Sequence, residues 1–451
     1  MRQGRVRRRG RERGKRKALA LLLLVLCLVT GGCVPKEQAD ETTAGKETTA
    51  SEEMGDRELP DTYDARLEGR VPPVRDQGSL GTCWAFASLT ALESSLLPEE
   101  QLEFSADHMT LHNSFSLSQD AGGEYSMAMA YLLAWQGPVL ESQDPYGDGI
   151  SPDGLTPYKH VQEIQILPEK DYTAIKRAVY LTGGVQSSLY TDMTEVQKDS
   201  RFYNRETNAY CYLGEEKPNH DSVIIGWDDH FPKERFQMEP ERDGAFLCTN
   251  SWGEGFGDQG YFYVSYEDSN IGVHNIVYTG VEPVDNYDRI CQTDLCGWMG
   301  QIGYGEETVW FANAYESYGG EELMAAGFYA TMENTSYELY VARHLERDGM
   351  EALNAPIFAG SGRMEYSGFY TVPLEKKVDL DEGEKFAVMV KITTPGAVHP
   401  AAIEYDGGEG VAQVDLSDGE GYISYDGRYW QRAEENYACN LCLKAFTDQI
   451  E

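Results

Sequence analysis

Positive charge is scarce in this sequence once its first 32 residues are set aside. The chain holds 38 Lys and Arg against 75 Asp and Glu, and residues 1–32 contain ten of the basic residues and one acidic residue. The remainder therefore keeps 28 basic and 74 acidic residues. This balance argues against nucleic acid as a partner, because phosphate binding needs clustered Lys and Arg. It indicates a solvated acidic surface, with cationic substrates or partners as the alternative.

The sequence also lacks, near its N-terminus, an apolar run long enough to cross a bilayer. A basic stretch, 2–17, precedes 13 apolar residues, 18–30, a length typical of a signal peptide. Small residues then lead to Cys33, which resembles a bacterial lipoprotein processing site with the lipid on Cys33; ordinary secretory cleavage and an uncleaved anchor are the alternatives. We expect residues 1–33 to direct export and residues 34–58, almost without aliphatic side chains, to be a disordered linker.

The segment from Gln77 to Phe86, Gln-Gly-Ser-Leu-Gly-Thr-Cys-Trp-Ala-Phe, carries the main functional signal. Apolar residues at helical spacing follow Cys83 without Gly or Pro, which predicts a helix that begins at or just before this cysteine. The positive end of a helix dipole lowers the pKa of a thiol and favours the nucleophilic thiolate. Taken alone, a cysteine next to Trp and Phe is more often an inert core residue.

Further segments supply the base, the orienting group and the oxyanion donor that a nucleophilic cysteine needs. His220 lies in Asn-His-Asp-Ser-Val-Ile-Ile-Gly-Trp, where residues 223–225 indicate a buried strand. Asn250 lies in Thr-Asn-Ser-Trp-Gly-Glu-Gly-Phe-Gly, before a glycine-rich turn. Gln77 precedes Cys83 by six residues, and His220 follows it by 137.

Together these motifs resemble the papain-type cysteine peptidases, in which His and Asn follow the cysteine by about 130–150 residues. The resemblance implies a two-lobed α+β domain over residues 59–282, with a helical N-terminal lobe, a β-sheet C-terminal lobe and the active site between them. The local patterns agree with this division. They predict helices at 127–135 and 172–181 and strands at 160–166 and 184–190.

The resemblance implies a role for each motif residue. Cys83 and His220 would form a thiolate–imidazolium pair, Asn250 would orient the imidazole, and Gln77 with the backbone N–H of Cys83 would hold the oxyanion. Trp252 would exclude water from the His–Asn contact. The other support and substrate-binding residues are Gly81, Gly122, Gly123 and Trp84. The backbone of Gly123 would pair with an extended substrate, and a plain glycine turn before a helix is the alternative.

The sequence departs from the family pattern in places. Leu80 stands where the family usually has a cysteine, and Thr82 where it has Ser or Ala. Asp221 replaces the small residue that commonly follows the catalytic histidine; it either faces solvent or tunes the imidazolium. About 25 residues separate Cys33 from the peptidase region. Control by removal of a long helical propeptide is therefore not expected.

Residues 290–449 show short aromatic or β-branched runs separated by Gly, Asn and Asp turns, which predict an all-β sandwich. The predicted strands include 310–315, 324–329, 337–341, 386–392 and 441–446. This half resembles the lectin-like domain of some bacterial surface proteases, mainly through 421–430 and 444–447. Tyr425, Tyr429 and Trp430 are explained by core packing, with stacking on a sugar as the alternative.

Six cysteines outside the motifs leave several pairings open. Cys211 and Cys248 flank the catalytic segments and are either a disulfide or two buried thiols. For the C-terminal four, disulfides are the first expectation in an exported protein, with free thiols and a zinc site as alternatives; these are Cys291, Cys296, Cys439 and Cys442. The acidic turns show no spaced calcium loop. No metal or other cofactor is expected.

These observations predict an exported cysteine endopeptidase. It would be held at the outer face of the cell membrane by a lipid on Cys33, or be secreted or associated with the cell wall. Its expected partners are protein or peptide substrates, and cell-surface carbohydrate is a candidate ligand of the C-terminal domain. The alternative is a catalytically inactive papain-fold protein that serves adhesion or carbohydrate binding.

Overall fold

The computed structural model describes residues 58–192, 200–408 and 411–450. The predicted signal peptide, the lipid site at Cys33 and residues 34–57 of the predicted linker lie outside these ranges. Within them, no helix combines the length and the apolar character needed to cross a membrane.

The N-terminal lobe is helical, as predicted. Helix α1 begins at Cys83, and Ser105 caps α2 by accepting a hydrogen bond from the backbone N–H of His108 at 2.9 Å. The helix predicted at 127–135 lies at 125–133. The helices of this lobe are α1 (Cys83–Leu96), α2 (Ala106–Leu111) and α3 (Tyr125–Leu133).

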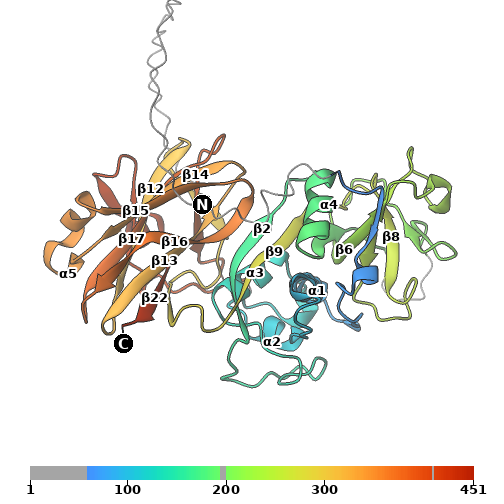
Figure 1. Cartoon of the computed structure of the whole chain (residues 1–451), viewed down its shortest axis with the longest axis horizontal. Coiled ribbons are helices and arrows are strands. Elements are labelled where there is room, and N and C mark those ends of the chain that lie inside the picture. The colour runs from blue at the N-terminus through green and yellow to red at the C-terminus, as the bar shows by residue number, and fades with distance from the viewer. Residues whose placement is uncertain (1–57, 193–199, 409–410, 451) are drawn as a thin grey trace, which may run out of the picture. The chain divides into compact units, whose positions relative to one another are not determined.

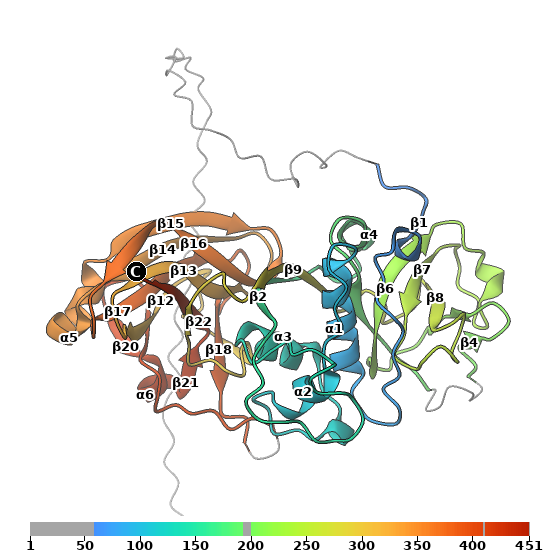
Figure 2. The same cartoon turned by 60° about the horizontal axis from the view of Figure 1, so that its bottom comes forward.

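The C-terminal lobe is a mainly antiparallel sheet that packs against α1 (Figures 1 and 2). The predicted helix at 172–181 is confirmed as α4 (Tyr172–Leu181), and the predicted strands at 160–166 and 184–190 are confirmed within one residue at each end. The strands are β1 (Thr62–Asp64), β2 (Lys159–Ile166), β3 (Val185–Leu189), β4 (Tyr203–Asn204), β5 (Ala209–Tyr210), β6 (His220–Asp228), β7 (Ala245–Thr249), β8 (Tyr261–Ser265) and β9 (Asn275–Pro283).

The residues from 289 onward form the predicted sandwich. One layer is a six-stranded sheet in the order β15-β14-β17-β12-β19-β20, and the facing layer contains β10, β22, β13 and β16. Apolar side chains from both layers, such as Phe311, Val341 and Phe328, share one core. The strands are β10 (Arg289–Cys291), β11 (Gly300–Ile302), β12 (Thr308–Glu316), β13 (Glu321–Ala330), β14 (Thr335–Ala342), β15 (Ile357–Met364), β16 (Ser367–Leu380), β17 (Lys385–Thr393), β18 (Ala401–Tyr405), β19 (Gly421–Ser424), β20 (Trp430–Arg432), β21 (Cys439–Leu441) and β22 (Leu443–Gln449).

One detail of the predicted sandwich is wrong. The run 441–446 was expected to be one strand, but the chain changes sheet near Cys442, with β21 in a three-stranded sheet and β22 in the large one. Strand β17 is buried on both faces, since Ala387 and Met389 are fully buried as well as Phe386 and Val388. Leu345 and Leu353 cover that second face from α5 (Leu345–Asp348) and the 3₁₀ turn at 349–354; α6 (Ala433–Tyr437) follows β20.

The largest sheet joins both halves of the described chain. Strand β16 pairs antiparallel with β2, so that residues 367–370 lie opposite residues 166–163. The resulting 13-stranded sheet runs from β10 in the sandwich through β16, β2 and β9 to β6 and β7 in the C-terminal lobe. No sequence pattern indicated this continuity, which joins the sandwich to β2, the strand that neighbours β9.

Candidate active site

Cys83 is the first residue of α1 and lies partly exposed against strand β6. Its thiol interacts with the backbone amide of Asp221, the residue that follows His220. The preceding residue, Thr82, contacts the hydroxyl of Tyr146 at 2.8 Å, and this hydroxyl donates to the carbonyl oxygen of Gln77 at 2.9 Å. These contacts fix the loop before the helix and bring the thiol to the start of β6.

His220 is held by two residues of the Asn-Ser-Trp segment. Its Nε2 lies 2.8 Å from Oδ1 of Asn250, and its ring stacks on the indole of Trp252 at 4.7 Å between centroids. His220 and Asn250 are buried, whereas Trp252 is only partly buried. The three side chains meet as the sequence predicted.

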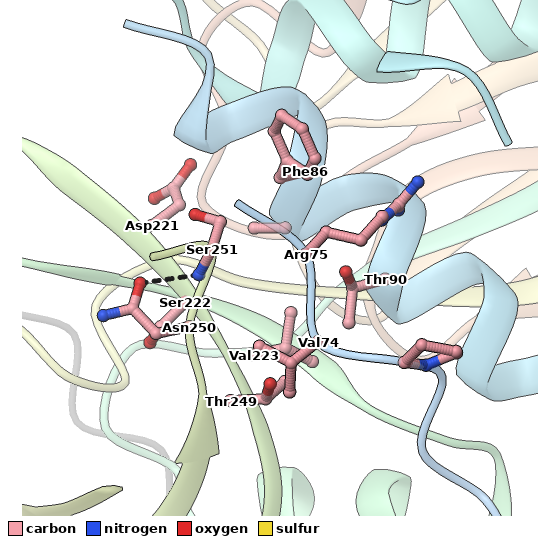
Figure 3. Close-up of a pocket in the computed structure, with 12 residues that line it drawn as sticks. Val74, Arg75, Phe86, Thr90, Asp221, Ser222, Val223, Thr249, Asn250 and Ser251 are labelled. Atoms are coloured by element: carbon pink, nitrogen blue, oxygen red, sulfur yellow. Dashed lines mark hydrogen bonds between the residues drawn. The ribbon is translucent and has the colours of Figure 1, made fainter. Parts of the chain in front are cut away.

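The hydrogen bonds of Asn250 determine which nitrogen of His220 carries the proton. Oδ1 of Asn250 also accepts a hydrogen bond from the backbone N–H of Ser251 at 2.8 Å, so it is the carbonyl oxygen of the amide (Figure 3). Nε2 of His220 must then donate to it. In the neutral imidazole this leaves Nδ1 unprotonated, and Nδ1 is therefore the nitrogen available as a base.

Burial opposes charge on both groups of the predicted ion pair. Burial, followed by the negative charge of Asp221, raises the pKa of the Cys83 thiol to about 12, although nearby backbone amides act in the opposite direction. Burial lowers the pKa of His220 to about 4, against the hydrogen bond to Asn250, which raises it. Desolvation thus favours the neutral form of each group, whereas the start of a helix favours the thiolate. The thiolate–imidazolium pair stays a prediction.

Gln77 is buried beside this site and is held at both ends of its amide. Its Nε2 donates to the carbonyl oxygen of Leu80 at 2.8 Å, and its Oε1 accepts from the hydroxyl of Ser251 at 2.7 Å. The backbone N–H of Gln77 also donates to the carbonyl oxygen of Ser251 at 2.8 Å. Sequence reasoning missed Ser251 as the residue that positions Gln77, although its place next to Asn250 was a usable signal.

The predicted glycines lie together around Trp84. A Cβ on Gly123 would stand 2.4 Å from Nε1 of Trp84, and a Cβ on Gly81 would stand 2.8 Å from the backbone nitrogen of Gly122. Gly122 has φ +80°, a conformation that favours glycine. Close packing therefore explains Gly81 and Gly123, and the backbone conformation explains Gly122, without a substrate.

Comparison with known proteins agrees with this geometry. Residues 59–281 match the family described as papain family cysteine protease, and residues 290–447 match the lectin like domain. Residues 59–281 are therefore a papain-family peptidase domain. Mouse cathepsin K is 27% identical over 228 residues, which are 48% of this chain and 64% of cathepsin K. The chain therefore spans less than two thirds of that relative.

Two solved structures extend the likeness to both halves of the chain. The clostridial cysteine protease Cwp84 after propeptide cleavage is 26% identical with a TM-score of 0.76, covering 86% of this chain and 99% of that one. The cysteine protease and lectin-like domains of Cwp84, a surface layer associated protein of Clostridium difficile, are 25% identical with a TM-score of 0.74, covering 87% and 90%. The combination of a papain-like domain with a lectin-like all-β domain is thereby shown.

The other cysteines that the structure describes are thiols. Every cysteine in the described ranges is free, so the expected disulfides are wrong; these thiols are Cys83, Cys211, Cys248, Cys291, Cys296, Cys439 and Cys442. The described residues contain no group of three or more His, Cys, Asp or Glu placed to hold a metal ion. Core packing is also wrong for two aromatic residues, because Tyr425 is 60% and Tyr429 is 81% exposed, whereas Trp430 packs against a buried cluster.

Proposed function

We propose that this protein is an endopeptidase that hydrolyses peptide bonds with Cys83 as the nucleophile and His220 as the base. The observation that carries the proposal is the arrangement at the start of β6. There the Cys83 thiol contacts the backbone of Asp221, and His220 is oriented by Asn250 through a 2.8 Å hydrogen bond. Family membership over residues 59–281 supports it.

The reaction begins with removal of the thiol proton. Nδ1 of His220 takes the thiol proton as the sulfur of Cys83 attacks the scissile carbonyl carbon, and the carbonyl oxygen becomes an oxyanion. The amide of Gln77 and the backbone N–H of Cys83 stabilise this oxyanion; loss of one such donor typically costs a factor of about 10²–10³ in rate. The imidazolium then protonates the leaving amine, and water hydrolyses the thioester.

An irreversible epoxide inhibitor of cysteine peptidases tests this assignment. We expect one mole of inhibitor per mole of wild-type protein, attached to Cys83, and parallel cleavage of a peptide library. The Cys83→Ala variant should neither be labelled nor cleave. Equal labelling of the wild type and Cys83→Ala would contradict the proposal and leave the inactive papain-fold protein as the better account.

We further propose that the protein acts outside the cytoplasm at the cell surface. The support is the predicted export segment, 1–33, together with the similar protein Cwp84, which is described as surface layer associated. A lipid on Cys33 would anchor it. Mass spectrometry of the mature N-terminus tests the anchor, since Cys33→Ser should abolish a lipid adduct without affecting cleavage by Cys83.

Carbohydrate binding is a second candidate for the sandwich. The exposed ring of Tyr425 lines an open hollow of about 650 Å³ together with Glu306, Glu307 and Thr308. An exposed aromatic face with neighbouring polar groups suits a sugar ring. A carbohydrate array probed with the full chain and with Tyr425→Ala tests this; no signal that depends on Tyr425 would favour a structural role.

A further inference from the structure

The carboxyl group of Asp221 lies in the candidate site itself. The backbone amide of Asp221 interacts with the Cys83 thiol, and the Oδ2 atom of Asp221 accepts a hydrogen bond from Nε2 of Gln186 at 3.1 Å. Gln186 is fixed in turn, because its Oε1 accepts from the hydroxyl of Ser88 on α1 at 2.8 Å. The carboxyl group is therefore held beside the nucleophile.

The buried hydroxyl of Ser188 has no hydrogen-bond partner and lies on the same face of the sheet as Asp221. Ser188 lies directly opposite Asp221 in the antiparallel register of β3 and β6, so both side chains project from the same face of the sheet. Gln186, two residues earlier on β3, projects from this face and reaches Asp221. Ser188 is 2% exposed, and its Oγ has no hydrogen-bond partner. A buried polar group without a partner indicates a missing one.

The negative charge at this place has no cation to balance it. Glu124 is exposed, caps α3 without bonding its backbone, and acts electrostatically on Asp221, Tyr125 and His274. His274 contacts the Tyr125 ring at 5.3 Å, and desolvation lowers its pKa, so it adds no positive charge at neutral pH. Among the described residues, no Lys or Arg forms an ion pair with Asp221 or Glu124.

Arg75 lines the narrow space between α1 and β6 together with Asp221, yet it is committed elsewhere. Its guanidinium contacts Glu93 at 3.1 Å and donates to the carbonyl oxygen of Phe104 at 2.7 Å. In Figure 3 the guanidinium points away from the carboxyl group of Asp221. A half-buried carboxylate without a cation is costly, so a cation supplied from outside would stabilise it.

We propose that Asp221, Glu124 and Ser188 form an acidic pocket that binds a lysine or arginine side chain of the peptide substrate, within three residues before the scissile bond. This proposal rests on the proposed function and names its substrate class. The side-chain cation pairs with Asp221 and donates to the free Oγ of Ser188, while Glu124 stands at the exposed side.

The pocket couples recognition to reactivity. The charge of Asp221 raises the pKa of the Cys83 thiol, so a bound cation that offsets this charge makes the thiolate easier to form. A basic side chain should therefore raise kcat as well as lower KM. A merely attractive surface charge would change KM alone.

Peptidyl-coumarin substrates that differ at one position test the pocket. Each of the three positions before the scissile bond carries Lys, Arg, Gln or norleucine in turn, and kcat and KM are measured for the wild type, Asp221→Asn and Glu124→Gln. Glu382→Gln, an exposed acid in a turn of the sandwich, is the matched control. We expect a preference for Lys or Arg of about tenfold to hundredfold at one position, which is the usual strength of a charge-assisted hydrogen bond.

The outcomes separate this inference from the proposed function. We expect Asp221→Asn to lose most of the preference, Glu124→Gln to lose part of it, and Glu382→Gln to keep it. Protein that reacts with the epoxide and cleaves Lys, Gln and norleucine peptides equally would overturn the acidic pocket alone. Protein that does not react with the epoxide overturns the peptidase assignment. If Asp221→Asn does not fold, an unchanged preference in Glu124→Gln still contradicts the proposal.

Discussion

At the residue scale, the groups around Cys83 decide how readily its thiol ionises. Burial and the charge of Asp221 oppose ionisation, while the backbone amides of Asp221 and Trp84 favour it. Burial also raises the pKa of Asp221 to about 6, an effect that Gln186 reduces and Glu124 increases. Asp221 is therefore mostly charged at neutral pH and mostly uncharged below pH 6. Its charge should impose a pH dependence on the nucleophile.

Replacing Asp221 by Asn should make the free thiol more reactive. Loss of the negative charge lowers the pKa of Cys83, so alkylation by iodoacetamide between pH 7 and 9 should become about tenfold faster, which corresponds to a shift of about one unit. Alkylation rates from pH 5 to 10, followed by mass spectrometry, measure this. The wild-type and Asp221→Asn rates should converge below pH 6, where Asp221 is already protonated.

Glu124→Gln is the control for this measurement, because Glu124 does not act directly on Cys83. It should change the alkylation rate far less than Asp221→Asn. An Asp221→Asn protein that is alkylated no faster than the wild type at any pH would contradict the role given to this charge.

Sequence reasoning located the residues that carry chemistry better than the residues that position them. Cys83, His220 and Asn250 stand in motifs of fixed spacing, and the structure joins His220 to Asn250 and places the Cys83 thiol beside the backbone of Asp221. Ser251 and Gln186 escaped notice because their partners, Gln77 and Asp221, are brought near by the fold and not by the sequence. The burial that raises the pKa of the Cys83 thiol was also beyond reach, since burial is a property of the packed structure.

At the element scale, local signals predicted the helices well. Helix α4 has its predicted ends because Asp171 caps it, accepting from the backbone N–H of Ala174 at 3.0 Å. Pairing between distant strands leaves no such local signal. The pairing of β16 with β2 depends on Gly368, which has φ +139° and whose absent Cβ would lie 2.1 Å from the carbonyl oxygen of Ile164.

Gly368→Ala should therefore weaken the junction between β16 and β2. We expect the wild type to unfold in one thermal transition and the variant to show an additional transition, at a lower temperature, for one half of the chain. The free energy of unfolding of that half should fall by about 1–3 kcal/mol, as for other strained backbone positions. Differential scanning calorimetry measures the transitions. Gly320→Ala is the control, because its Cβ would meet nothing closer than 4.0 Å.

Epoxide labelling of Cys83 in Gly368→Ala completes this test. Labelling should persist at low temperature, since the atoms nearest to a Cβ on Gly368 belong to Ile164 and Gln165, which are not residues of the candidate site. Coincident unfolding of Gly368→Ala and the wild type would show that the shared sheet does not couple the two halves.

At the scale of the whole molecule, free buried thiols replace the disulfides expected of an exported protein. Their protection comes from packing: Cys248 and Cys442 lie in the main core, and Cys291 and Cys439 lie in the core of the sandwich. Burial raises the pKa of each of these thiols and so suppresses the reactive thiolate. A large core, not covalent cross-linking, stabilises the described chain.

Thiol titration of a chain comprising residues 58–451 checks this account without any substitution. In the native protein, an aromatic disulfide reagent should react with about one thiol, Cys83, which alone among the described cysteines is partly exposed. In denaturant and without reductant, all seven should react. The midpoint of urea unfolding should not change when a reducing agent is added, because no disulfide constrains the unfolded chain. Fewer than seven reactive thiols in denaturant, together with a midpoint that falls on reduction, would show that disulfides stabilise the protein after all.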